Sequence, residues 1–100
     1  MNHPKGSLPI FRIQCKTGDM AGAWLWTITA FKAGMPVQSP SWGGILQNLN
    51  QYTFHAQFVL DESSALKPVS RGRAEGFVRI LTTMGIDAGI VTVRPPRRGS

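Results

Sequence analysis

Hydrophobic and polar residues alternate in three segments of the chain, which is the pattern of a strand with one buried face. These segments are residues 10–17, 23–31 and 52–60. From the alternation we assign the following side chains to the core: Phe11, Ile13, Cys15, Trp24, Trp26, Ile28, Ala30, Tyr52, Phe54, Ala56, Phe58 and Leu60. Because a glycine-rich turn, GDMAG, joins the first two segments, we expect them to form a hairpin.

A helical period replaces the alternation in the last third of the chain. Over residues 71–85 apolar residues recur at intervals of three and four and form one stripe: Ala74, Phe77, Val78, Leu81 and Met84. Ser70 is suited to cap the first turn of this helix and Gly85 to end the last one. Residues 90–93 are rich in β-branched side chains, which is typical of a short strand.

Residues 39–51 carry mixed signals. Ser39 before Pro40 is typical of a helix start, whereas Gly43 and Gly44 disfavour a helix interior. Four apolar residues nevertheless lie at helical spacing: Trp42, Ile45, Leu46 and Leu49. We predict a short helix that covers one end of the sheet.

The order of the elements is therefore strand, strand, short helix, strand, helix, strand. It predicts an α+β two-layer sandwich, in which a mainly antiparallel sheet of about four strands carries one principal amphipathic helix on one face. One hundred residues with 42% apolar content suffice for one core and leave no room for a second. We expect a single domain over residues 1–94 and a basic tail rich in proline and arginine over residues 95–100.

The sheet face that turns away from the principal helix is predicted to be polar. The alternation assigns to it Arg12, Gln14, Lys16, Thr27, Thr29, Thr53, His55 and Gln57. Hydroxyls, amides and positive charges without a carboxylate suit the phosphates and base edges of nucleic acid. An antiparallel sheet with one face in water shows the same residue types, so both interpretations stay open.

Positive charge is the main bias of the composition. Eleven Lys and Arg residues against five Asp and Glu give a formal net charge of +6, which favours acidic partners in general. The densest cluster is the C-terminal segment TVRPPRRGS, in which two prolines stiffen the chain ahead of two arginines. The candidate phosphate or nucleic-acid contacts are Arg12, Lys16, Arg71, Arg73, Arg94, Arg97 and Arg98. Charged tails at chain ends are often only solvated, so this role of the tail stays open too.

Catalytic and metal-binding signatures are missing from the sequence. The carboxylates show no paired spacing, and the alternation places Cys15 and His55 on opposite sides of their strands, where they cannot act together. We therefore expect no enzyme, no metal site and no cofactor. A lone cysteine excludes an internal disulfide and favours the cytoplasm. No apolar run has the length of a signal peptide or a membrane helix, so we expect no membrane partner.

Two functions are consistent with these patterns. The first, slightly favoured, is a small protein-interaction module: a homo-oligomer, or an inhibitor or adaptor of an acidic partner. It would use Trp42, which lies between glycine and proline residues, together with the free sheet edges and residues 61–69. The alternative is a nucleic-acid-binding module that uses the polar sheet face and the arginine tail. A small-ligand-binding protein with a pocket lined by the aromatic strands is a third interpretation.

Overall fold

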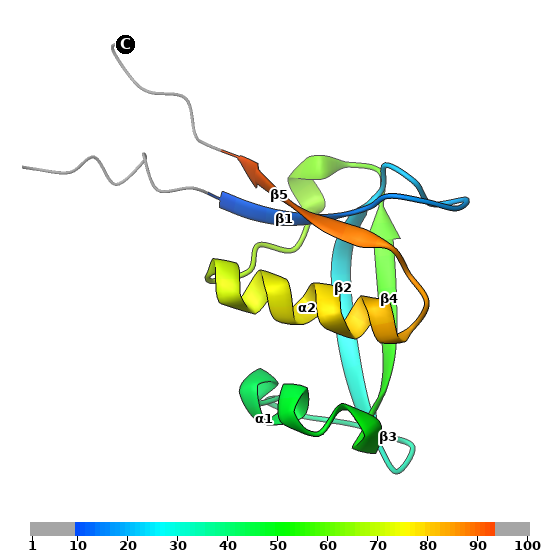
Figure 1. Cartoon of the computed structure of the whole chain (residues 1–100), viewed down its shortest axis with the longest axis vertical. Helices are drawn as coiled ribbons and strands as arrows, with labels where there is room; N and C mark the ends of the chain where they lie inside the picture. Colours follow the sequence, from blue (N-terminus) through cyan, green and yellow to red (C-terminus); the bar gives the residue numbers. More distant parts are fainter. Residues whose placement is uncertain (1–9, 94–100) are drawn as a thin grey trace, which may run out of the picture.

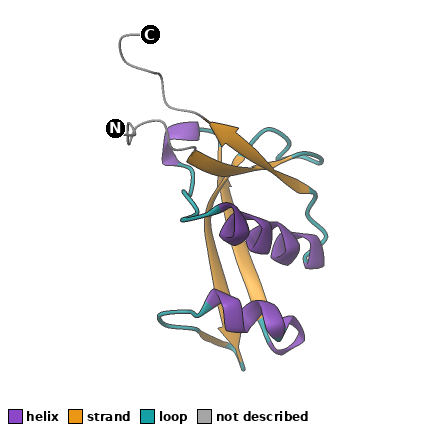
Figure 2. Ribbon diagram, turned by 60° about the vertical axis from the view of Figure 1, so that its left-hand side comes forward, coloured by secondary structure: helices purple, strands orange, loops and turns teal. Residues whose placement is uncertain are grey.

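Residues 10–93 are described by the computed structural model, and they form an antiparallel five-stranded sheet with two α-helices. The strands are β1 (Ile10–Cys15), β2 (Trp24–Lys32), β3 (Met35–Pro36), β4 (Thr53–Val59) and β5 (Ala88–Val93). The helices are α1 (Trp42–Gln47) and α2 (Arg71–Thr83), with the 3₁₀ turns η2 (Leu49–Gln51) and η3 (Glu62–Ser64). Both α-helices lie over the same face of the β2–β4 pair (Figure 1, Figure 2). The predicted α+β sandwich with one principal helix is confirmed. The predicted tail, residues 95–100, lies outside the described residues.

Strand β2 is the centre of the sheet, whose order is β3-β2-β1-β5 with β4 paired to the other edge of β2. Its pairing with β4 runs from Trp24↔Val59 to Phe31↔Thr53. Its pairing with β1 is a single pair, Gln14↔Trp24, whereas β1 pairs along its whole length with β5. In Figure 1, β1 and β5 cross one end of the long β2–β4 pair. The predicted hairpin of β1 and β2 therefore exists at its turn, and beyond the turn the two strands separate to take other partners.

A β-bulge in β2 reverses the alternation that the sequence suggests. Leu25 pairs with Phe58 and Thr27 with the adjacent Gln57, so Trp26 has no partner of its own in β4. The extra residue turns Leu25 into the core, where it is 0% exposed, and turns Trp26 outward, where it is 48% exposed. The assignment of Trp26 to the core is wrong, and the face assigned to Trp24 is wrong for the same reason.

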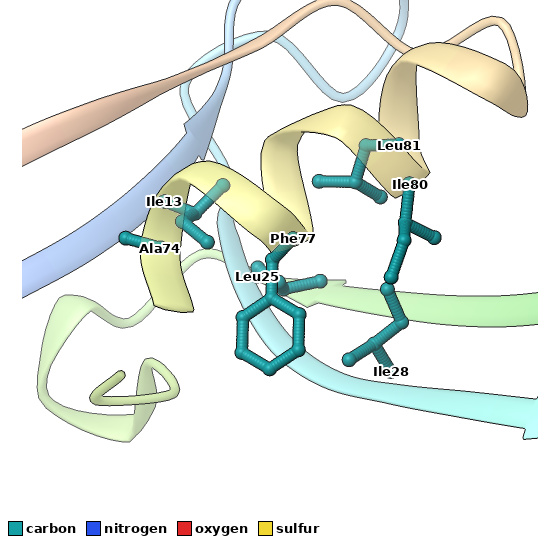
Figure 3. Packing of buried hydrophobic residues seen from close by; sticks show 7 residues of the cluster. All are labelled: Ile13, Leu25, Ile28, Ala74, Phe77, Ile80 and Leu81. Carbon is teal, nitrogen blue, oxygen red and sulfur yellow. The ribbon is translucent and has the colours of Figure 1, made fainter. Parts of the chain in front are cut away.

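The core lies between α2 and the sheet. Its buried cluster consists of Ile13, Leu25, Ile28, Ala74, Phe77, Ile80 and Leu81. In Figure 3, Ile80 of α2 points toward Ile28 of β2, and Phe77 extends beside Leu25. The predicted stripe of α2 is confirmed at Ala74, Phe77 and Leu81, and it also includes Ile80, which the prediction omitted.

The boundaries of α2 follow from local chemistry. The Ser70 hydroxyl accepts a hydrogen bond from the Arg73 amide at 3.1 Å, which satisfies one of the free donors of the first turn. Gly85 has a φ of +81°, in the left-handed region where glycine carries no steric penalty, and it ends the helix. Both ends agree with the prediction.

Helix α1 packs against α2 through a glycine. A Cβ at Gly76 would lie 2.5 Å from Leu46 Cδ1, so any larger residue here would require the Leu46 side chain to shift. The Trp42 ring meets the Phe77 ring edge to face, with centroids 5.0 Å apart. The predicted short helix is confirmed, and it extends the core alongside α2 toward the β3 end of the β2–β4 pair (Figure 1).

Two strand boundaries differ from the prediction. Strand β4 ends at Val59, so Leu60 is 83% exposed and its assignment to the core is wrong. The chain after β2 turns back at Ala33 and Gly34, which both have positive φ, and β3 forms with Pro36 on the edge of the sheet. A proline is tolerated there because no further strand needs its missing N–H.

Candidate functional site

The face of the β2–β4 pair that turns away from α1 and α2, here called the outer face, is covered by neither α-helix (Figure 2). The register brings together Thr27 with Gln57 and Thr29 with His55 on this face. Its nine residues are Trp24, Trp26, Thr27, Thr29 and Phe31 of β2 and Thr53, His55, Gln57 and Val59 of β4. In Figure 2 both α-helices lie on the opposite side of these strands. Five of the eight residues that the sequence assigned to a polar face are therefore neighbours on it.

Trp26 is the residue that sequence reasoning missed. It lies at the bulge, between Leu25 and Thr27, and it is about half exposed. A tryptophan offers a large rigid apolar area together with one N–H donor, which suits it to contacts that are apolar at the centre and polar at the rim. The signal in the sequence was the run of three apolar residues from Trp24 to Trp26, because a strand with one buried face cannot bury all three and must expose at least one of them.

The outer face is polar without being basic. Among its nine residues only His55 is titratable, and none is an acid, a lysine or an arginine. Seven of the eleven basic residues and all five acidic ones lie within residues 10–93, so the described part has a net charge of only +2. The two basic residues that the sequence assigned to the polar face, Arg12 and Lys16, lie outside this outer face.

Arg12 lies inside the fold instead of on the open face. Its guanidinium Nη1 donates to the Glu62 carbonyl oxygen at 2.6 Å and lies 3.2 Å from Glu62 Oε2, and its side chain is 12% exposed. Because Glu62 belongs to η3, this contact fastens the segment after β4 over the outer side of β1. A guanidinium engaged in this way is not presented to a phosphate.

The segment that covers Arg12 is stabilised by Asp61. Its carboxylate accepts hydrogen bonds from the Ser63 hydroxyl and amide and from the Ser64 hydroxyl. These bonds, those of Ser63 first, lower the pKa of Asp61, and the positive charge of Arg12 adds a smaller effect of the same sign. The ionised carboxylate therefore holds the η3 turn together.

The other candidate phosphate contacts do not gather at one place. Lys16 lies across Gly89, and its amide donates to the Asp87 carbonyl oxygen beyond the end of α2. Arg71 and Arg73 lie at the opposite end of that helix, roughly 20 Å away for 13 residues. Arg71 Nε is 3.3 Å from Glu75 Oε2, an exposed pair. Arg94, Arg97 and Arg98 lie outside the described residues.

Trp42, the candidate partner contact, is half-buried at the start of α1. Its ring packs on Phe77, and it belongs to the residues that surround the buried cluster. The side chain therefore contributes to the packing of α1 on α2. Only part of it is left for a partner.

A hollow of about 380 Å³ lies between β4 and two loops. Its lining is Cys15, Thr17, Gly18, Asp19, Met20, Ala56, Phe58, Gly85, Ile86 and Asp87. Cys15 is buried, as predicted, and its thiol donates to the Thr17 carbonyl oxygen at 3.2 Å. Within residues 10–93 no three His, Cys, Asp or Glu side chains are grouped to hold a metal ion.

The described helices and the comparisons with known proteins add no functional assignment. Of the helices in the described part, none is long and apolar enough to cross a membrane. No protein-family model matches the chain, and no curated protein or solved structure is similar to it. The outer face and the free edges of the sheet are therefore the candidate functional surfaces.

Proposed function

We propose that this protein is a small non-enzymatic protein-interaction module that binds a partner protein through the outer face of the β2–β4 pair. The observation that carries the proposal is the 48% exposed side chain of Trp26 in a sheet face that neither α-helix covers. Tryptophan is among the residues that most often dominate the binding energy of protein interfaces. The bulge holds this side chain outward, so its orientation is already set before a partner binds.

The residues around Trp26 suit the rim of a protein interface. Thr27, Thr29, His55 and Gln57 offer hydroxyl, imidazole and amide groups that exchange hydrogen bonds with a partner. The face has no carboxylate and no ammonium group, so its burial carries no large cost of removing a charge from water. Interface centres are depleted in charged residues in the same way.

A photo-crosslinking experiment tests this function. A photoreactive amino acid is placed at Thr29, on the outer face, and in a matched variant at Val69, which is 84% exposed in the loop before α2. We expect protein adducts of defined mass from position 29 and none from position 69. Trp26→Ser then weakens the affinity for the identified partner about 30-fold, the effect of an interface hot spot, whereas Val69→Ser leaves it unchanged. Equal adducts from both positions contradict the proposal.

A nucleic-acid-binding module is the second candidate, because the outer face has no carboxylate to repel phosphates and most of the net positive charge lies outside residues 10–93. Deletion of residues 97–100 then lowers the magnitude of the salt dependence of DNA or RNA binding by about one to two units in a log-log plot. Replacement of Arg71 and Arg73 by glutamine is the comparison at the helix start. If the protein shows no measurable affinity for DNA or RNA at low ionic strength, this candidate is excluded.

A cytoplasmic location accompanies both candidates. The chain has one cysteine, Cys15, and its side chain is buried. A single thiol cannot form an internal disulfide, which is typical of chains in a reducing compartment. Fractionation of cells that produce the protein tests this proposal.

A further inference from the structure

The free edge of β4 lacks the features that protect most edge strands. β4 pairs with β2 on one side, and no other strand within residues 10–93 lies along its opposite edge. Edge strands are usually short, or carry charges, prolines or bulges that prevent pairing with another chain. β4 is seven residues long, TFHAQFV, with no lysine, arginine, acid, proline or glycine, and the bulge of this pair lies in β2.

The other free edges of the sheet do not share this property. β3 has two residues, and one of them is Pro36. β5 contains Gly89, which weakens a strand, and the Lys16 side chain lies across it. β4 is therefore the edge best suited to accept a further strand.

We propose that a second copy of this chain pairs with β4 in the antiparallel direction, about a two-fold axis at Ala56, and joins the two sheets into one. The sequence of β4 is self-complementary in this register. Phe54 lies opposite Phe58 of the second copy and His55 lies opposite its Gln57, and the axis repeats each pair. The inference goes beyond the proposed function, because it concerns the free edge of β4 and not the outer face.

The register agrees with the faces of the strand. Phe54, Ala56 and Phe58 lie on the helix-covered face of β4, where they pack around the buried cluster, and His55 and Gln57 lie on the outer face. Directly opposite residues of an antiparallel pair share a face, so the two-fold axis matches aromatic with aromatic and imidazole with amide. No like charges meet across it.

The hollow beside β4 supports the same arrangement. Ala56 and Phe58 form one wall, and Met20 and Ile86 are among the apolar residues of the loops opposite. Phe54 of the second copy would lie next to Phe58, which lines the hollow. An aromatic side chain from the partner would there replace water against apolar atoms.

The expected dimer is a reversible one. Pairing of two seven-residue strands buries less than the roughly 1,200 Å² of a standard protein interface. We therefore expect the fraction of dimer to change with protein concentration, with a dissociation constant on the order of micromolar to millimolar.

A charge swap on the edge strand tests the pairing and its register, with sedimentation equilibrium as the measurement. In His55→Lys/Gln57→Lys each lysine faces a lysine across the axis, and we expect the dissociation constant to rise at least tenfold. In His55→Lys/Gln57→Glu each lysine faces a glutamate, and the dissociation constant returns to within about threefold of the parent value. The matched control Thr27→Lys/Thr29→Lys places the same charges on the same face, one strand inward, and leaves the dimer intact.

The outcomes separate this inference from the proposed function. A parent protein that sediments as a monomer at every concentration overturns the pairing, and so does a swap variant that fails to restore the dimer. Trp26→Ser weakens binding of the outer-face partner and leaves the dimer unchanged. If the parent protein stays monomeric but binds a partner through Trp26, only the proposed pairing with a second copy is contradicted. If the parent protein dimerises but binds no partner through Trp26, only the outer-face proposal is contradicted.

Hydrogen exchange gives a second measurement that requires no substitution. The amides of residues 53–59 that point away from β2 exchange freely in the monomer and gain protection when a strand pairs with them. We expect their protection to rise with protein concentration, while that of α2 stays constant. Protection that is independent of concentration along β4 also overturns the pairing.

Discussion

The outer side of the sheet has a closed region and an open one, and each is marked by one side chain. At the β1–β5 pair, Arg12 is 12% exposed beneath the η3 segment, whereas at the β2–β4 pair Trp26 is 48% exposed. Burial of an arginine and exposure of a tryptophan reverse the usual preference, and such reversals are the informative ones. The chain covers one region with its own residues 61–66, and it leaves the other region uncovered. This difference supports the proposal that the β2–β4 pair carries an interaction surface.

The largest expected effect is the loss of stability at Leu25, the residue before the bulge of β2. Leu25 is 0% exposed and packs in the central cluster, so Leu25→Ala should lower the free energy of unfolding by about 2 to 5 kcal/mol. Leu60→Ala, at an exposed leucine, is the matched control and should change it by less than about 0.5 kcal/mol. Chemical denaturation measures both. Similar values for the two variants would show that the bulge has been placed wrongly.

A smaller loss of stability is expected in the closed region. Arg12→Ala leaves the Glu62 carbonyl oxygen without its donor and should cost about 1 to 3 kcal/mol, because the contact is largely screened from water. Glu62→Gln keeps that carbonyl oxygen and should cost less. Arg12→Lys restores the charge without the planar donor fork, so it is expected to recover only part of the loss. An unchanged denaturation midpoint in Arg12→Ala would contradict the closed region.

In the open region, a substitution should weaken partner binding and leave stability nearly unchanged. Trp26→Ser truncates an exposed side chain and should change the free energy of unfolding by less than about 0.5 kcal/mol, although it weakens partner binding about 30-fold. Thermal unfolding beside the binding measurement checks this separation. A destabilised Trp26→Ser variant would place the side chain in the fold instead of in an interface.

The smallest expected effect is on the dependence of stability on pH in the acid range. Because the pKa of Asp61 is lowered in the folded state from its ordinary value of 3.8, its contribution to stability is fully present above that value. The contribution is lost as the pH falls through the lower folded-state pKa. Asp61→Asn should therefore make stability less dependent on pH below about 4 and slightly lower at neutral pH. Denaturation curves of parent and variant at several pH values measure it, and identical pH dependence would contradict the role of Asp61.

Local patterns in the sequence determined the elements and much of their orientation. The period of Ala74, Phe77 and Leu81, with Ser70 before it and Gly85 after it, predicts α2 because the interactions that define a helix lie within four residues of each other. The alternation around Ile13 correctly predicts the inward face of β1. The open polar face was predicted in the same way at Thr27, Thr29, His55 and Gln57.

Only the tertiary structure decided which of these side chains are exposed and which are buried. The bulge at Trp26 depends on the register between β2 and β4, and the burial of Arg12 depends on Glu62, 50 residues away in the sequence. Strand register and long-range ion pairs are selected by the packing of the whole core, which no short window of sequence contains. The sequence by itself therefore determined an α+β sandwich with one capped helix, and the three-dimensional packing decided that a tryptophan faces outward and an arginine inward.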